Sequence, residues 1–305
     1  MRDQFYLGLV VACVAIVPGH EASAHAYAGD RLFPVTLTMD DPGVADEASI
    51  PTFTFQRNDN SGTPTNQYGF NFEFDKRITK DFGVGVNWGW NVNSIKDGKT
   101  AGGFQNLFLS AKYQTYVNPD HEFLLSLGVI REMGGTGNVN QGADRFGSTQ
   151  PTVYMGKGFG DLPFGLLRPF AITGELGYQV QDVKINSTGD NMGGTNAVKA
   201  ALSLQYSMPY LRAQVKDYAL PEFVNRLVPI VELTWSAPTG GAVARPTTFT
   251  VAPGVIYMAD HWQFGVEALI PGNTATGNHV GFIAQFHVFL DDIFPNILGK
   301  PIADW

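Results

Sequence analysis

Apolar residues alternate with small or polar residues along most of this chain. In residues 82–93 (FGVGVNWGWNVN) every even position carries Phe, Val or Trp, whereas every odd position carries Gly or Asn. A period of two predicts a β-strand, because successive side chains of a strand point to opposite faces of the sheet. This strand therefore has one bulky apolar face, which must be covered, and one face that is almost bare.

The same alternation recurs along the chain, and no helical period is found in these segments. We expect twelve strands at about residues 50–58, 67–76, 82–93, 104–116, 122–132, 149–159, 168–181, 196–207, 226–236, 247–258, 261–271 and 279–290.

The connections between the expected strands alternate between long and short. The long ones are rich in Gly, Asn, Ser and Thr, and the short ones include RITKD, NPDH and ADH. Outer-membrane barrels join antiparallel strands in this way, with long outer loops and short periplasmic turns. One connection, MPYLRAQVKDYALPEFVNR, is too long for a turn and predicts either a helical excursion or a missed pair of strands. After Leu290 we expect a helical turn near Asp291 and a terminal strand that ends at Trp305.

Composition identifies what covers the apolar faces. Charged residues make up 16% of the chain, against about 25% in typical soluble proteins, and the mean hydropathy is −0.05. A soluble β-sandwich is the alternative, but its exposed face should carry Lys, Glu and Thr rather than Gly, Asn and Gln. We therefore predict an all-β fold: a closed antiparallel transmembrane β-barrel of about 12 strands over residues 49–305, covered by lipid.

The N-terminal residues predict secretion. Residues 1–24 contain a short apolar run and the triplet Ala22-Ser23-Ala24, which is typical of a cleaved signal peptide. Residues 25–48 show no clear period and are expected to form a non-barrel segment, either periplasmic or plugging the lumen. Cys13, the single cysteine, lies within the signal; a lipobox is the alternative role for it.

Removal of the expected signal changes the charge and thiol content. It takes away Arg2, Asp3 and Glu21, which leaves 19 basic and 26 acidic residues and a net charge of −7. This acidity argues against a nucleic-acid partner, for which a basic patch is expected. A mature chain without cysteine also has no disulfide, thiolate metal site or cysteine nucleophile.

Residues on the polar faces of the expected strands would line the lumen. Those that could act on a solute are Glu73, Glu175, Glu232, Glu267, Lys112, Lys199, Gln263, Gln285 and His287. Four carboxylates with fewer basic groups would favour cations or polar neutral solutes. The alternative is that these residues pair with one another or with the N-terminal segment and only fill the interior.

We do not expect this protein to be an enzyme. An outer-membrane phospholipase with twelve strands exists, but its chemistry needs Ser, His and an orienting group in contact. The chain has no G-x-S-x-G motif, and of the five histidines after residue 24 only His287 lies in mid-strand. We predict no catalytic residue, no enzyme activity, no cofactor and no metal site. The one metal alternative is copper at His25, which would become the N-terminal residue after cleavage.

The sequence resembles a family of bacterial outer-membrane barrels described as meta-pathway phenol-degradation proteins or as transporters. The resemblance lies in the segments HAYAGDRLFPVTLTMDDPGVADE, ITKDFGVGVNWGWN, RPFAITGELGYQ and FLDDIFPNILGKPI. It covers most of the chain after the signal and consists of fold and secretion patterns rather than active-site motifs. The resemblance implies an outer-membrane channel for small organic compounds.

These observations together predict a channel in the outer membrane of a Gram-negative bacterium. The expected role is passive or gated diffusion of small solutes through an acidic-leaning, porin-like lumen. The alternative role is a scaffold or sheath that holds a periplasmic or electron-transfer partner and carries no solute. The expected partners are outer-membrane lipid, a small-molecule solute and the outer-membrane assembly machinery.

Overall fold

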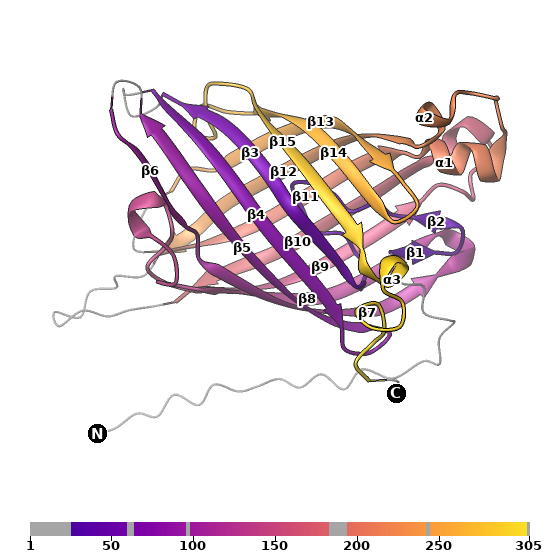
Figure 1. The fold of residues 1–305 in the computed structure, drawn as a ribbon, viewed down its shortest axis with the longest axis horizontal. Helices are drawn as coiled ribbons and strands as arrows, with labels where there is room; N and C mark the ends of the chain where they lie inside the picture. The colour runs from indigo at the N-terminus through magenta and orange to yellow at the C-terminus, as the bar shows by residue number, and fades with distance from the viewer. Residues whose placement is uncertain (1–25, 60–63, 96–97, 183–193, 242–244, 304–305) are drawn as a thin grey trace.

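The computed structural model describes residues 26–59, 64–95, 98–182, 194–241 and 245–303. These residues form one large antiparallel sheet that closes on itself, a two-stranded ribbon inside it, and short helices, most of them at one end of the barrel (Figure 1). Within the described part of the chain, no helix is long and apolar enough to cross a bilayer. The expected signal peptide lies outside the described residues, as do Cys13 and His25.

The barrel has twelve strand positions, each hydrogen-bonded to the next in chain order. One position is shared by two strands, because β6 and β7 both pair with β5 and follow each other along the barrel wall. The wall consists of β3 (Glu47–Asn58), β4 (Thr65–Arg77), β5 (Phe82–Ile95), β6 (Thr100–Phe104) with β7 (Leu107–Asn118), β8 (Phe123–Met133), β9 (Ser148–Gly158), β10 (Phe170–Gln181), β11 (Thr195–Tyr206), β12 (Leu227–Gly241), β13 (Thr248–Met258), β14 (Trp262–Pro271) and β15 (Gly281–Phe289).

Closure of the barrel occurs between its first and last strands. Phe282, Ala284 and Val288 of β15 lie opposite residues of β3 in antiparallel register. Every strand except the short β6, which pairs only with β5, therefore has two neighbours. The sheet has no long free edge, as a membrane-spanning sheet requires. The expected barrel of about twelve strands is confirmed.

Side chains at alternate positions of a strand face outward or inward, as the sequence pattern predicts. Exposed large apolar residues occupy alternate positions of most barrel strands and include Phe72, Val86, Val153, Leu204 and Phe264. The opposite positions carry mostly polar or small residues, apart from a buried apolar group on the inner faces of β12 to β15. The outer surface is thus an apolar band of the kind that contacts lipid.

The opening strand of the sequence pattern, β5, carries an outward aromatic cluster at the break between β6 and β7. The ring of Trp88 stacks on Phe104 with centroids 4.2 Å apart, and Trp90 meets the same ring edge-on at 4.6 Å. The indole Nε1 of Trp88 donates a 3.0 Å hydrogen bond to the carbonyl oxygen of Gln105. The cluster therefore gives a carbonyl at the strand break a hydrogen-bond partner.

The long connection between β11 and β12 is a helical excursion, and no strand pair is missing there. It contains α1 (Met208–Tyr210), η4 (Leu211–Val215) and α2 (Glu222–Asn225). Three shorter helices lie in other connections: η1 (Pro119–His121), η2 (Val139–Gln141) and η3 (Gly165–Leu167). The excursion lies at the same end of the barrel as the short turns and the start of β3 (Figure 1). By the rule of short periplasmic turns, this is the periplasmic end.

The prediction of a terminal strand is wrong for the described residues 294–303. After β15 the chain forms α3 (Leu290–Ile293) and then turns, with Pro295 and Pro301 interrupting any strand pairing. The backbone N–H of Ala303 donates a 2.7 Å hydrogen bond to Ile78 in the turn after β4. Because β15 already closes on β3, no edge remains to pair with a further strand. Trp305 lies outside the described residues.

Candidate functional site: the barrel lumen

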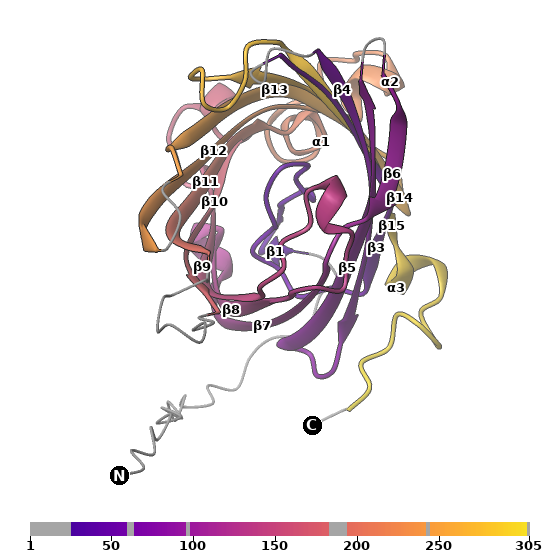
Figure 2. The same ribbon diagram turned by 90° about the vertical axis from the view of Figure 1, so that its left-hand side faces the viewer.

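The N-terminal segment, residues 26–46, runs inside the barrel. Its strands β1 (Tyr27–Ala28) and β2 (Arg31–Leu32) pair as a short ribbon. When the barrel is viewed from its outer end, β1 is visible within the ring of strands (Figure 2). Phe33 packs in a buried apolar cluster with Leu124 of β8 and Ala171 of β10. The segment is therefore attached to the inner wall and does not hang below the barrel.

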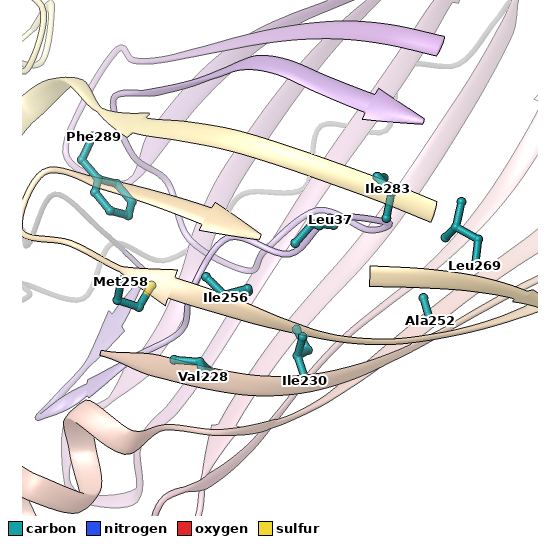
Figure 3. Packing of buried hydrophobic residues seen from close by; sticks show 9 residues of the cluster. All are labelled: Leu37, Val228, Ile230, Ala252, Ile256, Met258, Leu269, Ile283 and Phe289. Atoms are coloured by element: carbon teal, nitrogen blue, oxygen red, sulfur yellow. The ribbon is translucent and has the colours of Figure 1, made fainter. Parts of the chain in front are cut away.

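Leu37 is the main apolar attachment of the segment. It lies in a cluster of buried side chains from the inner faces of four neighbouring strands (Figure 3). The wall residues of this cluster are Val228, Ile230, Ala252, Ile256, Met258, Leu269, Ile283 and Phe289. Apolar residues on the inward face of a barrel would be poorly placed in a water-filled pore, and here Leu37 covers them.

A single wall carboxylate holds the backbone of the segment at the same level. Glu232 of β12 is fully buried and accepts hydrogen bonds from the backbone N–H of Leu37 at 2.9 Å and of Thr38 at 2.7 Å. The hydroxyl of Thr38 donates a further hydrogen bond to the same carboxylate. Gln263 donates a 2.6 Å hydrogen bond from Nε2 to the carbonyl oxygen of Val35. The polar wall residues thus satisfy backbone groups that would otherwise be buried without partners.

Ion pairs fix the two ends of the segment. Arg31 donates from Nε to Glu122 at 3.1 Å, and its guanidinium lies 3.7 Å from the ring centroid of Tyr210. Burial, with the hydrogen bond from its hydroxyl to Glu122, raises the pKa of Tyr210 to about 12. At the other end, Asp46 pairs with Lys76 and Arg77 at 2.7 Å each.

The segment divides the interior into two cavities. The outer cavity, of about 400 Å³, has Thr38 and Asp40 on one side and wall residues such as Glu175, Lys199 and Ser236 on the other. The periplasmic cavity, of about 420 Å³, lies between β1, β2 and the helical excursion, and includes Tyr27, Leu32 and Tyr210 in its lining. Residues 34–38 lie between the two cavities and reach β12 and β14.

The nine residues expected in the lumen all lie on the inner face of the wall, but in two groups. Glu73, Glu175 and Lys199 line the outer cavity, and Lys112 beside it donates hydrogen bonds to Asp40 Oδ1 and to the carbonyl oxygen of Asp41, both at 2.8 Å. The second group is buried around the N-terminal segment or in the wall, and consists of Glu232, Glu267, Gln263, Gln285 and His287.

The buried group contacts protein rather than an aqueous path. His287 lies 3.0 Å from the hydroxyl of Ser49 through Nδ1 and 3.2 Å from Glu47 through Nε2. Gln285 donates a 3.1 Å hydrogen bond to the hydroxyl of Thr52. A direct role in solute selectivity therefore remains a prediction for Glu73, Glu175, Lys112 and Lys199.

Sequence reasoning missed several residues of the outer cavity. Asp40 comes from the aperiodic N-terminal segment, so no strand parity could assign it to the lumen. Phe108 and Ile130 are apolar residues on the inner parity of their strands and also line the cavity. Their inward positions in the alternating pattern are a usable signal, which an expectation restricted to polar residues overlooks.

Comparison with known proteins rests on structure alone. No protein-family model matches the chain, and no curated protein matches it in sequence. An outer membrane channel from Pseudomonas putida F1 is similar in structure, with a TM-score of 0.53 and 11% identity over 85% of this chain and 99% of that chain. The chain has the fold of an outer-membrane β-barrel.

Another similar solved structure is the KdgM porin, with a TM-score of 0.48 and 11% identity over 79% of this chain and 98% of that chain. The expected location in an outer membrane agrees with this fold and with the apolar outer band. The narrower resemblance to meta-pathway phenol-degradation proteins has no support in these comparisons and stays a prediction.

Proposed function

We propose that this protein is an outer-membrane channel for the diffusion of small solutes, and that residues 26–46 are its plug. The observation that carries the proposal is the pair of cavities, about 400 and 420 Å³, which the N-terminal segment separates. Barrels of twelve strands lie between those filled by their own side chains and the wide porins. A path through this barrel therefore requires the segment to move aside.

The charges around the outer cavity favour cations or polar neutral solutes. Among the described residues that line it, Asp40, Glu73 and Glu175 are acidic and Lys199 is basic, and Lys112 beside the cavity pairs with Asp40. A narrow lumen with an excess of carboxylates raises the local concentration of cations and repels anions. The apolar surface of Phe108 and Ile130 adds a place for the carbon skeleton of an organic solute, in line with the family resemblance.

The test is the conductance of the purified barrel in planar bilayers, with residues 25–305 compared with a chain that lacks residues 26–46. We expect small or rare currents from the complete chain and frequent currents, selective for cations, from the truncated one. Because the deletion also removes buried contacts, the truncated barrel must first keep the heat-modifiable gel mobility of a folded barrel.

Two outcomes would contradict the proposal. Equal conductance of both chains would mean that residues 26–46 do not close the path. An absence of current from the folded, truncated barrel would contradict the channel function itself and would favour the scaffold or sheath for a periplasmic partner.

A further inference from the structure

A group of exposed apolar side chains lies at the periplasmic end of the barrel and takes no part in the lumen. Three come from the connection between β9 and β10 and three from the excursion between β11 and β12. We call this group the periplasmic patch; its members are Phe164, Leu166, Leu167, Tyr218, Leu220 and Phe223. Phe164 and Phe223 are 69% and 63% exposed, and the two connections lie beside each other, because a Cβ at Gly165 would lie 3.1 Å from Cγ1 of Val215. Exposed apolar side chains gathered in this way are typical of a surface that contacts a membrane or another protein.

The patch continues the lipid-facing surface of the barrel. The ring of Phe223 stacks on Tyr257 of β13 with centroids 5.4 Å apart. Tyr257 in turn lies 5.6 Å from Trp262 of β14, and Trp262 lies 5.5 Å from Phe286 of β15. Trp262 and Phe286 belong to the outward apolar rows of their strands. An unbroken line of rings thus leads from the band that contacts lipid to the excursion.

Ion pairs hold the excursion in this position. Glu222 of α2 pairs with Arg212 of η4 at 2.6 Å and with Arg226 at 3.0 Å. Arg226 also pairs with Asp260, in the turn between β13 and β14, at 2.8 Å. The charged side of the excursion is therefore tied to itself and to the barrel rim, which leaves Phe223 on the other side.

The charge beside the patch suits a phospholipid headgroup. Lys216 is exposed, and its ammonium lies 5.1 Å from the ring centroid of Tyr218. Aromatic rings together with lysine are the residues that settle at the boundary between headgroups and acyl chains. A lysine there can pair with lipid phosphate while its neighbouring ring enters the interface.

We infer that the periplasmic patch docks onto the phospholipid surface of the periplasmic leaflet and anchors the excursion in the membrane interface. The line of rings from β15 to α2 favours lipid over a protein partner. It joins the patch to the apolar outer band of the barrel, which faces lipid. The inference concerns the outer rim of the barrel and is independent of whether the lumen conducts.

The test uses spin labels on single cysteines, which is possible because residues 25–305 contain no cysteine. Phe223→Cys and Leu166→Cys report on the patch. Val266→Cys is the lipid-facing control, and Asp120→Cys, in the exposed turn after β7, is the water-facing control at the same end. Each labelled barrel is reconstituted in vesicles of phosphatidylethanolamine and phosphatidylglycerol, and its fold is checked by heat-modifiable gel mobility.

Collision with oxygen, which concentrates in the bilayer, is compared with collision with a water-soluble nickel complex. We expect the ratio of oxygen to nickel accessibility at Phe223→Cys and Leu166→Cys to exceed that at Asp120→Cys several-fold and to approach that at Val266→Cys. A ratio equal to that at Asp120→Cys would overturn the inference. Shielding from both reagents would also overturn it, because it would indicate a second copy or another protein on the patch.

Discussion

At the scale of single residues, Asp291 shows how a buried carboxyl makes stability depend on pH. It lies in α3, where Oδ1 accepts a 3.0 Å hydrogen bond from the N–H of Asp292, whereas Oδ2 is buried and has no hydrogen-bond partner among the described residues. Burial, reinforced by the charge of Asp292, raises the pKa of Asp291 to about 7. The unfolded chain would release this proton near pH 4. Stability is therefore lost as the pH rises from about 4 through 7.

We predict that Asp291→Asn removes this loss of folding stability at high pH, because asparagine cannot release a proton. The variant should be more stable than the parent at pH 8, by on the order of 1–2 kcal/mol, and nearly equal to it at pH 4. The measurement is the midpoint of thermal unfolding, followed by gel mobility in detergent at both pH values.

Asp260→Asn is the matched control for this prediction. Asp260 is exposed, and its hydrogen bond and ion pair with Arg226 lower its pKa. A lowered carboxyl pKa contributes stability above the unfolded pKa, and this contribution is lost only as the pH falls below it. Asp260→Asn should therefore give no gain in stability at pH 8 relative to pH 4, in contrast to Asp291→Asn. An effect of Asp291→Asn that is the same at pH 4 and pH 8 would contradict the assignment.

At the scale of elements, the N-terminal segment packs against β14 at Gly265, where the absence of a side chain leaves room for Leu37. A Cβ at Gly265 would lie 2.6 Å from Cδ1 of Leu37, which is closer than any ordinary contact. We predict that Gly265→Val costs about 1–3 kcal/mol of stability through overpacking and displaces the segment from the wall. Single-channel recording should detect this as more frequent currents than the parent gives.

Leu37→Ala provides the control, because it removes the atoms that the new valine would meet. Because Leu37→Ala also weakens the attachment of the segment, it is recorded alone as well. The double variant Gly265→Val with Leu37→Ala should give fewer currents than Gly265→Val alone and about as many as Leu37→Ala alone. If Gly265→Val conducts like the parent, contact with Leu37 does not hold the segment closed.

At the scale of the whole molecule, the distribution of charge over the lumen sets the expected ion selectivity. Replacement of the two wall carboxylates of the outer cavity in Glu73→Gln with Glu175→Gln removes two negative charges and leaves Lys199 in place. In the barrel that lacks residues 26–46, we predict a severalfold lower permeability ratio of cations to anions. The reversal potential in a salt gradient measures this ratio. Asp120→Asn removes a charge outside the lumen and should leave the ratio unchanged; an equal effect of both would contradict a lumenal filter.

The fold of the barrel was predictable from local pattern because each strand must place apolar groups in lipid and small or polar groups inside. Alternation in β5, with Trp88 and Val86 on one face, therefore indicated both the strand and its orientation. The same reasoning assigned Glu73 and Glu175 to the inner face. It failed for the residues after Leu290, where Pro295 and Pro301 are incompatible with strand pairing.

The sequence alone determined the fold class, the number of barrel strands and the inward faces, since these depend on a period of two that is repeated in every strand. The tertiary structure decided what fills the interior. Residues 26–46 have no periodic pattern, so their path along the lumen depends on contacts with distant residues such as Glu232, Gly265 and Arg77. Those contacts join residues that are far apart in the sequence and meet only in the closed barrel, so no local signal in the chain records them.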